Sequence, residues 1–281
     1  MSPLLPSPFD LEFMQRAAVE ILLLAPLAGL LGAQIVLRRL AFFTHSVGTA
    51  AFPGLVVAGP LGLPPAFCAL AAGTLFAAAL ERLGRAARLA YDSATALLLV
   101  AALALGIILA SDVYKSGTEV DQLLFGSLLA IGGDEIAATV VALGVASIAA
   151  LLFRRSWIAS GFDPAASRSL GLSRSAADWT LFAAIAIAAV AALDATGALL
   201  IGAVLVIPAA TARLFATSVA GLELGATVIA AVEGVGALWI AFQLDVPPGA
   251  AIATLGGIVF IVAAGARTAF GIGAGRRSVA A

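Results

Sequence analysis

The stretch RRLAFFTHSVGTAAFPG, Arg38 to Gly54, closes one apolar run, opens the next and contains the only histidine of the chain. Across the 281 residues, 62% are hydrophobic and 11% are charged, and the mean hydropathy is +1.12. Soluble domains are roughly 45–50% apolar and about 25% charged. Similar apolar runs recur to the C-terminus, so they predict membrane spans and not a cleaved leader. The sequence therefore predicts an all-α polytopic membrane protein with one transmembrane domain, residues 1–281.

Apolar runs between charged or polar turns predict the order of the spans. The run Ser46–Gly59 is short and has Pro53 and Gly54 in its middle, so we interpret it as a broken or re-entrant helix that counts as one crossing. Leu123–Ile131 has about half of the roughly 20 residues that a crossing needs, which favours an interfacial or re-entrant helix. The other predicted spans are Arg16–Leu37, Pro64–Leu80, Thr95–Ala110, Ile136–Phe153, Trp179–Leu193, Gly197–Phe215, Gly225–Phe242 and Gly249–Ala266.

These segments predict about nine transmembrane helices, or about eight if the short element does not cross. With the N-terminus outside and the C-terminus inside, all of the 15 basic residues except Arg16 and Lys115 fall on the inner side. The positive-inside rule expects this asymmetry. The polar segment 156–178 and the basic tail 267–281 are then cytoplasmic.

Polar and ionisable residues inside the predicted spans are the candidates for a translocation pathway. His45 and Thr49 are four residues apart and share a helix face; His45 is either a transition-metal ligand or a polar residue at the membrane interface. Glu233 lies mid-span, where an ionisable group is costly unless it faces the bundle interior or water. Asp194 is either a pathway residue or a solvated helix end. Pro208 predicts a kink that frees backbone carbonyls, which occurs in transporters and also in inert membrane helices.

The composition restricts metal and enzyme chemistry. With one histidine and one cysteine, Cys68, the chain cannot form an internal disulfide or a CxxC site, and we expect no stable metal site. The sequence has no HExxH, GxSxG or Walker A motif, so ATP hydrolysis would come from a separate subunit. An intramembrane enzyme or a membrane scaffold is the alternative from a different class.

Five blocks in chain order carry a family resemblance: VLRRLAFFTHSVGTAAFPG (36–54), LLFGSLLAI (123–131), FDPAASRSLGL (162–172), TGALLIGAVLVIPAATARL (196–214) and LDVPPGAAI (244–252). Together they resemble the membrane-spanning permease subunit of metal-uptake ABC transporters of the zinc, manganese and iron type. The resemblance implies a fold similar to the permeases of cobalamin and iron-siderophore importers. It also implies that the segment 156–178 holds a coupling helix seated in the ATPase, through Asp163, Pro164, Ala166, Leu170 and Gly171.

The resemblance implies import of a divalent transition metal, zinc, manganese or iron, across the plasma membrane by alternating access. The implied partners are a cytoplasmic ABC ATPase that holds ATP and magnesium, an extracytoplasmic substrate-binding protein or lipoprotein, a second permease copy and membrane lipid. We expect no cofactor on this chain and no nucleic-acid partner. Members of the family carry an aspartate and a histidine four residues apart in the opening stretch; aligned on Pro53 and Gly54, this chain has His45 and Thr49 there. A chelated metal or a non-metal cargo is therefore the alternative.

Overall fold

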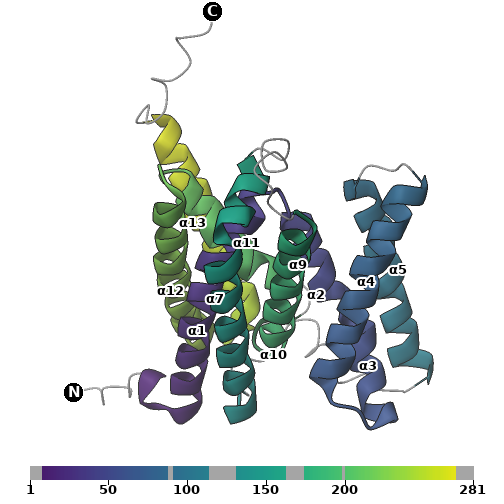
Figure 1. Ribbon diagram of the computed structural model, residues 1–281. Helices are drawn as coiled ribbons and strands as arrows, with labels where there is room; N and C mark the ends of the chain where they lie inside the picture. The colour runs from purple at the N-terminus through teal and green to yellow at the C-terminus, as the bar shows by residue number, and fades with distance from the viewer. Residues whose placement is uncertain (1–7, 88–90, 114–130, 163–173, 198–199, 270–281) are drawn as a thin grey trace, which may run out of the picture.

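The computed structural model describes residues 8–87, 91–113, 131–162, 174–197 and 200–269, and the regular structure within these ranges is helical (Figure 1). Six helical segments are long and apolar enough to cross a membrane: Glu12–Leu37, Ala41–Leu61, Ser93–Ser111, Gly133–Ala159, Val219–Leu244 and Pro248–Ala269. Three shorter apolar helices, Pro65–Leu80, Ala176–Ala191 and Ile201–Arg213, coincide with further predicted spans. The prediction of an all-α polytopic membrane protein is confirmed, whereas the number nine and the orientation stay predictions.

Helix α1 (Glu12–Leu37) is the centre of the bundle and contacts α7 (Gly133–Phe162), α11 (Ile201–Arg213) and α12 (Val219–Leu244). Two glycines on α1 make these contacts close. A side chain at Gly29 would overlap Thr227 of α12, and one at Gly32 would overlap the Leu205 carbonyl of α11. Small residues let helix backbones approach in a membrane, where lipid removes the hydrophobic drive between helices.

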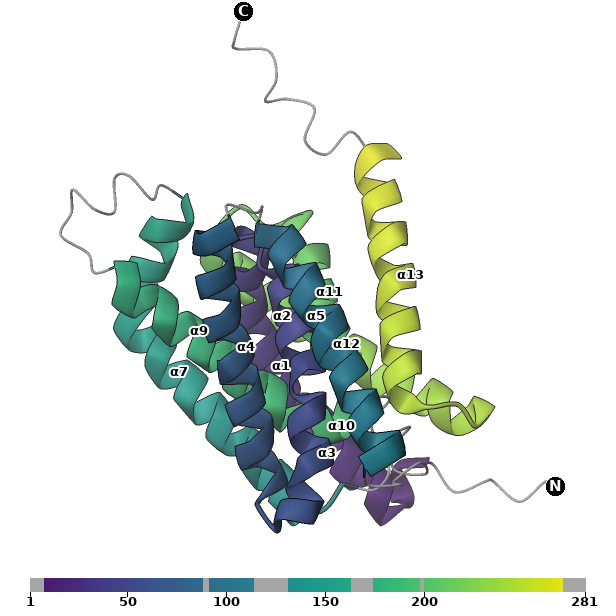
Figure 2. The same ribbon diagram turned by 90° about the vertical axis from the view of Figure 1, so that its right-hand side faces the viewer.

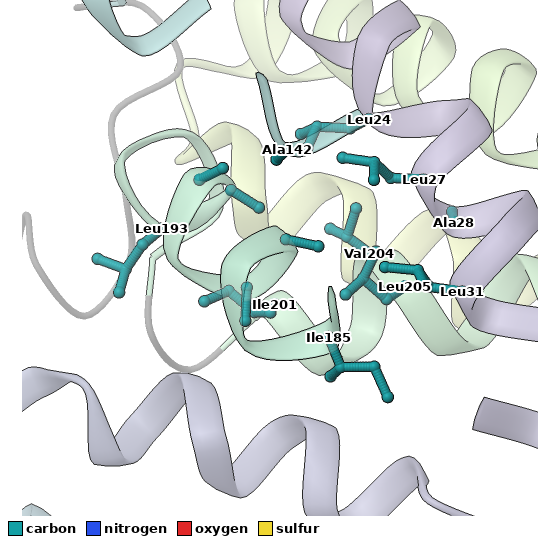
Figure 3. Packing of buried hydrophobic residues seen from close by; sticks show 14 of the residues in the cluster. Leu24, Leu27, Ala28, Leu31, Ala142, Ile185, Leu193, Ile201, Val204 and Leu205 are labelled. Carbon is teal, nitrogen blue, oxygen red and sulfur yellow. The ribbon is translucent and has the colours of Figure 1, made fainter. Parts of the chain in front are cut away.

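A cluster of buried hydrophobic side chains packs α1 against α11. In Figure 3, Leu27 and Leu31 of α1 lie against Val204 and Leu205 of α11, and Ile185 of α9 (Arg174–Ala191) closes the cluster from another side. Each of these five side chains is buried. These side chains pack α11 against α1 and α9.

The Ser46–Gly59 element differs from the prediction. Helix α2 (Ala41–Ala50) runs into α3 (Phe52–Leu61) through Ala51, which keeps right-handed helical angles of φ −70° and ψ −23°. Pro53 lies in the first turn of α3, so its missing N–H removes one backbone bond without turning the chain out of the helix. The predicted shortness is wrong, because α2 and α3 together span 21 residues from Ala41 to Leu61. The element is nevertheless divided into two helices, at Ala51.

The second difference is at α7, which continues past Arg154 and Arg155 to Phe162, whereas the predicted span ends at Phe153. A helix that has left the apolar layer still satisfies its backbone hydrogen bonds internally, so charged residues need not end it. The predicted Leu123–Ile131 helix lies outside the described residues except for its last residue.

The remaining helices complete the bundle. They are the short helix η1 (Pro8–Asp10), α4 (Pro65–Ala87), α5 (Tyr91–Ile108) with the π-helical turn η2 (Leu109–Val113), α10 (Leu193–Thr196) and α13 (Pro248–Ala269). In both views α1 begins at one end of the bundle and α13 finishes at the other (Figures 1 and 2).

Candidate functional site

His45 lies on α2 where this helix contacts α11. The two helices meet at Gly202, because a Cβ atom added there would be 2.9 Å from His45 Cβ. His45 is half-buried and is the only titratable residue of α2. The structure thus places the imidazole in a seam between two helices, instead of on a fully exposed helix end. A neutral imidazole in such a seam can act as a single ligand for a passing transition metal.

Thr49 lies one turn after His45 on the same helix and is 1% exposed. Its Oγ1 donates a hydrogen bond to the His45 carbonyl oxygen at 3.1 Å. Ser46 and Thr44 bond the carbonyls four residues earlier in the same way, at 2.8 Å to Phe42 and 3.0 Å to Leu40. Such bonds satisfy hydroxyls within an apolar bundle. These three hydroxyl groups are therefore bonded to the backbone of their own helix.

Glu233 lies on α12 and is 5% exposed. It lines a cavity of about 20 Å³ between α1, α10, α11, α12 and α13, whose other walls include Leu24, Val204 and Ile252. Its Oε1 has no hydrogen-bond partner among the described residues. A cavity of this size holds about one water molecule. Because an unpartnered buried carboxylate is costly, Glu233 is stable here when it is protonated or when it holds a water molecule or a cation.

Pro208 lies inside α11 and lines the same cavity as Glu233. Proline has no N–H, so the carbonyl of Val204, four residues earlier, lacks its usual helical donor. Val204 is also a wall of this cavity. Pro208 and Glu233 therefore line the same small space.

The two candidate groups do not form one cluster. Gly202 of α11 contacts His45, whereas the following residues Ala203 and Val204 line the Glu233 cavity, so α11 separates the groups. Asp194 lies on α10, and its side chain is outside the described part of the structure. Among the described residues, no group of three or more His, Cys, Asp or Glu side chains could hold a metal ion. Any metal contact within the described chain would therefore involve few protein ligands.

Pro53 and Gly54 mark a close contact instead of a break. A Cβ atom at Gly54 would overlap the Cys68 carbonyl of α4, so only glycine fits at this crossing of α3 and α4. Cys68 itself is buried and free. The Pro53 ring packs near Gly106 of α5. These residues position α2, and with it His45, by packing.

The predicted coupling residues Asp163, Pro164, Ala166, Leu170 and Gly171 lie outside the described residues. The helix ends on both sides of them are described, and one arginine joins them. Arg38 Nη1 donates to Asp178 Oδ1 of α9 at 2.5 Å, and its Nη2 donates to the Trp157 carbonyl of α7 at 2.9 Å. Trp157 Nε1 donates to the Ala177 carbonyl at 2.8 Å. The ends of α7 and α9 are thus tied to the junction of α1 and α2.

Sequence reasoning used Arg38 only to orient the chain and missed this network. The sequence offered only a weak signal for this network, because a tryptophan and an aspartate in a polar segment look like ordinary surface residues. Only the packing of α7 and α9 brings them to Arg38. A second buried acid, Glu20 of α1, is 0% exposed and accepts a hydrogen bond from Thr139 Oγ1 of α7 at 2.5 Å. Its position inside an apolar run was the available signal.

Long apolar helices that enclose buried acids and a half-buried histidine indicate a multi-pass membrane protein. Residues 10–266 match the ABC 3 transport family, and the chain belongs to this family.

Relatives and a solved structure agree with this assignment. The chain is 28% identical over 255 residues to the manganese transport system membrane protein MntC of Halalkalibacterium halodurans, covering 90% of this chain and 86% of MntC. It is 28% identical over 260 residues to the chelated iron transport system membrane protein YfeD of Yersinia pestis, covering 92% and 87%. The structure of PsaBC from Streptococcus pneumoniae in complex with Fab matches with a TM-score of 0.83 at 26% identity, covering 90% of this chain and 91% of that chain.

The resemblance to permease subunits of ABC transporters is therefore confirmed. The chain is a multi-pass permease of the plasma membrane and not an enzyme. The alternatives of an intramembrane enzyme or a scaffold are set aside by these comparisons.

Proposed function

We propose that this permease imports a divalent transition metal, zinc, manganese or iron, by alternating access. The observation that carries the proposal is the family match over residues 10–266, together with relatives named for manganese and chelated iron transport. In the proposed assembly, two copies of the chain join two cytoplasmic ATPase subunits, which hold ATP and magnesium, and one extracytoplasmic binding protein or lipoprotein. We propose about nine crossings with the N-terminus outside, as the arginine distribution favours.

The seam between α2 and α11 is the proposed place where the cation meets the protein. His45 supplies a single nitrogen ligand there, half-buried against Gly202. A single ligand binds weakly, and weak binding suits transit because the ion must also leave. Thr49 holds the adjacent helical turn through its bond to the His45 carbonyl.

The network at Arg38 supports a path for the coupling motion. In the proposal, the ATPase grips residues 163–172 and moves them when ATP closes its dimer. The segment's neighbours Trp157 and Asp178 bond Arg38 at the end of α1, directly before α2. A displacement of α7 and α9 would thus reach the helix that carries His45. This is a rigid-body transmission between two packed states.

Reconstitution tests the proposal. Liposomes that contain the permease and its ATPase, supplied with the binding protein, should accumulate manganese, zinc or iron only when ATP is present on the side of the membrane that carries the ATPase. His45→Ala should lower uptake while the complex assembles normally. Ser46→Ala is the matched control, because this side chain bonds only helix backbone in the hydrogen bonds found for it. Normal metal uptake by the His45→Ala variant would show that His45 serves only in helix packing. A complex that assembles but shows no ATP-driven metal uptake would overturn the proposed function.

A chelated metal is the second candidate cargo. The relative YfeD is named for chelated iron. In addition, this chain has His45 and Thr49 where the family resemblance implies an aspartate and a histidine. Uptake of free metal and of the same metal with a chelator, measured in parallel, separates the two cargoes. A non-metal cargo would be indicated by a binding protein that holds neither.

A further inference from the structure

The small cavity inside the bundle has two polar side chains in its described lining, Glu233 of α12 and Thr196 of α10. The other described lining residues are apolar side chains and glycines. Glu233 is 5% exposed and Thr196 is 0% exposed. The volume of about 20 Å³ is sufficient for one water molecule. A ligand of this cavity must therefore be small, and it must satisfy both side chains.

Both side chains offer hydrogen-bond acceptors to the cavity. Thr196 Oγ1 donates its one proton to the Ala192 carbonyl at 2.9 Å, so only its lone pairs are left for a ligand. An ionised carboxylate has no proton to donate, and Glu233 Oε1 has no hydrogen-bond partner within the described part of the chain. Buried polar groups are normally hydrogen-bonded. Two buried acceptors in one small space thus require a donor between them.

No positive charge in the described lining balances Glu233, because this lining contains no arginine, lysine or histidine. Two other acids lie on the neighbouring helices. Glu20 of α1 accepts a hydrogen bond from Thr139 of α7, and the side chain of Asp194 of α10 lies outside the described part of the structure. An uncompensated charge in an apolar bundle is costly, and a carboxyl group avoids this cost when it keeps its proton.

A proton suits this cavity better than a metal cation does. Calcium takes about six to eight oxygen ligands, and magnesium takes about six. The described side chains of the cavity offer only the carboxylate of Glu233 and the hydroxyl oxygen of Thr196. A metal cation here would therefore have too few protein ligands, whereas a proton needs only one.

We propose that Glu233 and Thr196 form a site for one proton and one water molecule. The carboxyl group of Glu233 keeps its proton and donates it in a hydrogen bond to the water molecule, which in turn donates to Thr196 Oγ1. The site joins α12 to α10 without a net charge. It depends neither on the cargo nor on the orientation of the chain, so a failure of metal uptake counts against the proposed function alone.

The proton also affects the packing of α13. Glu233 Oε2 lies beside Gly256 of this helix, since a Cβ atom added to the glycine would be 3.3 Å from this oxygen. The same added atom would be 3.1 Å from Ile207 Cγ2 of α11. A neutral carboxyl group tolerates such an apolar contact, whereas a carboxylate requires more water around it. Loss of the proton at high pH should therefore weaken the contact between α12 and α13.

Infrared spectroscopy detects this proton directly, through the C=O stretching band of a protonated carboxylic acid. The sample is the full-length permease in a detergent that has no carbonyl group. An exposed glutamate ionises near about pH 4.3, so a band that remains at about pH 7 reports a retained proton. The unmodified chain should show this band, and Glu233→Gln should lose it. Glu20→Gln is the matched control, because it changes the other buried acid and should leave the Glu233 band in place.

A third variant tests the water molecule. Thr196→Val removes the acceptor for the water and should shift the Glu233 band without abolishing it, because the hydrogen bonding of the carboxyl group changes. An unshifted band in Thr196→Val would refute the bridging water. Absence of the band in the unmodified chain, or its survival in Glu233→Gln, would refute the retained proton.

The melting temperature as a function of pH provides an independent test. The folded chain holds a proton that the unfolded chain releases, so raising the pH from about 6 to about 9 should lower the melting temperature of the unmodified chain more than that of Glu233→Gln. An equal pH dependence of the two chains would overturn the proposal. A rise in melting temperature with sodium or manganese that Glu233→Gln lacks would assign the cavity to a cation instead.

Discussion

Arg38 provides the sharpest test of how the helices communicate. Its guanidinium joins α9 through Asp178 and α7 through the Trp157 carbonyl. Replacement of Arg38 by Met keeps the length of the side chain and removes both bonds. The ends of α7 and α9, which flank the predicted coupling residues, would then lose their connection to the start of α2.

The size of the effect follows from burial. The Arg38 side chain is 9% exposed and that of Asp178 is 25% exposed. Breaking a fully buried ion pair costs about 3–5 kcal/mol. The Asp178 carboxylate is partly exposed, so water can reach it in the variant, and the loss should be nearer to the roughly 1.5–3 kcal/mol of a hydrogen bond to a charged group. In a chain of this size, about 2 kcal/mol lowers the melting temperature by roughly 4–8 °C.

Two measurements check this prediction: the melting temperature of the purified permease, and the metal taken up per ATP hydrolysed in liposomes. Arg38→Met should lower both, whereas Arg38→Lys should restore part of each, because a lysine ammonium keeps the charge but not the two-pronged geometry. The double variant with Asp178→Asn should lose less than the sum of the single variants, since both remove the same bond. Additive losses, or an unchanged ratio of uptake to hydrolysis in Arg38→Met, would refute the transmission path.

Two further predictions concern the candidate residues. Gly202→Val should separate α11 from α2 and reduce both thermal stability and metal uptake, because a Cβ atom at that position would lie only 2.9 Å from His45 Cβ. Gly257→Val is the control, because Gly257 has open space around it. Equal melting temperatures of the two variants would contradict the close contact. Glu233→Met should leave the melting temperature equal or higher, because it removes an unpartnered buried carboxylate. A clear fall in its melting temperature would reveal a stabilising partner, and its uptake rate shows whether the cavity belongs to the pathway.

The membrane class and most helix positions were predictable because hydropathy is a local property. A run of about 20 apolar residues identifies a span without knowledge of its neighbours. The prediction failed where local chemistry was ambiguous. Pro53 and Gly54 predicted a short element, yet α2 and α3 together span 21 residues, because proline in the first turn of α3 removes only one backbone bond. The charged pair Arg154 and Arg155 signalled an end, yet α7 continues.

The candidate site was only partly predictable. The pattern identified His45, Thr49 and Glu233 as polar residues in apolar surroundings, and all three lie inside the bundle. Their separation by α11 depends on which faces of the helices meet, and no single segment encodes that. Arg38 bonds Trp157 and Asp178, which lie 119 and 140 positions away in the sequence, so no local pattern could reveal this network.

By itself, the sequence determined that this chain is a multi-pass membrane protein with a small set of intramembrane polar residues, because apolar length acts locally against the bilayer. The tertiary structure alone decided that His45 faces Gly202, that Glu233 occupies a separate cavity and that Arg38 ties three helices together. The physical reason is that close helix packing depends on the shapes of both partners, and glycine positions on α1, α3 and α11 set those shapes only once the helices meet.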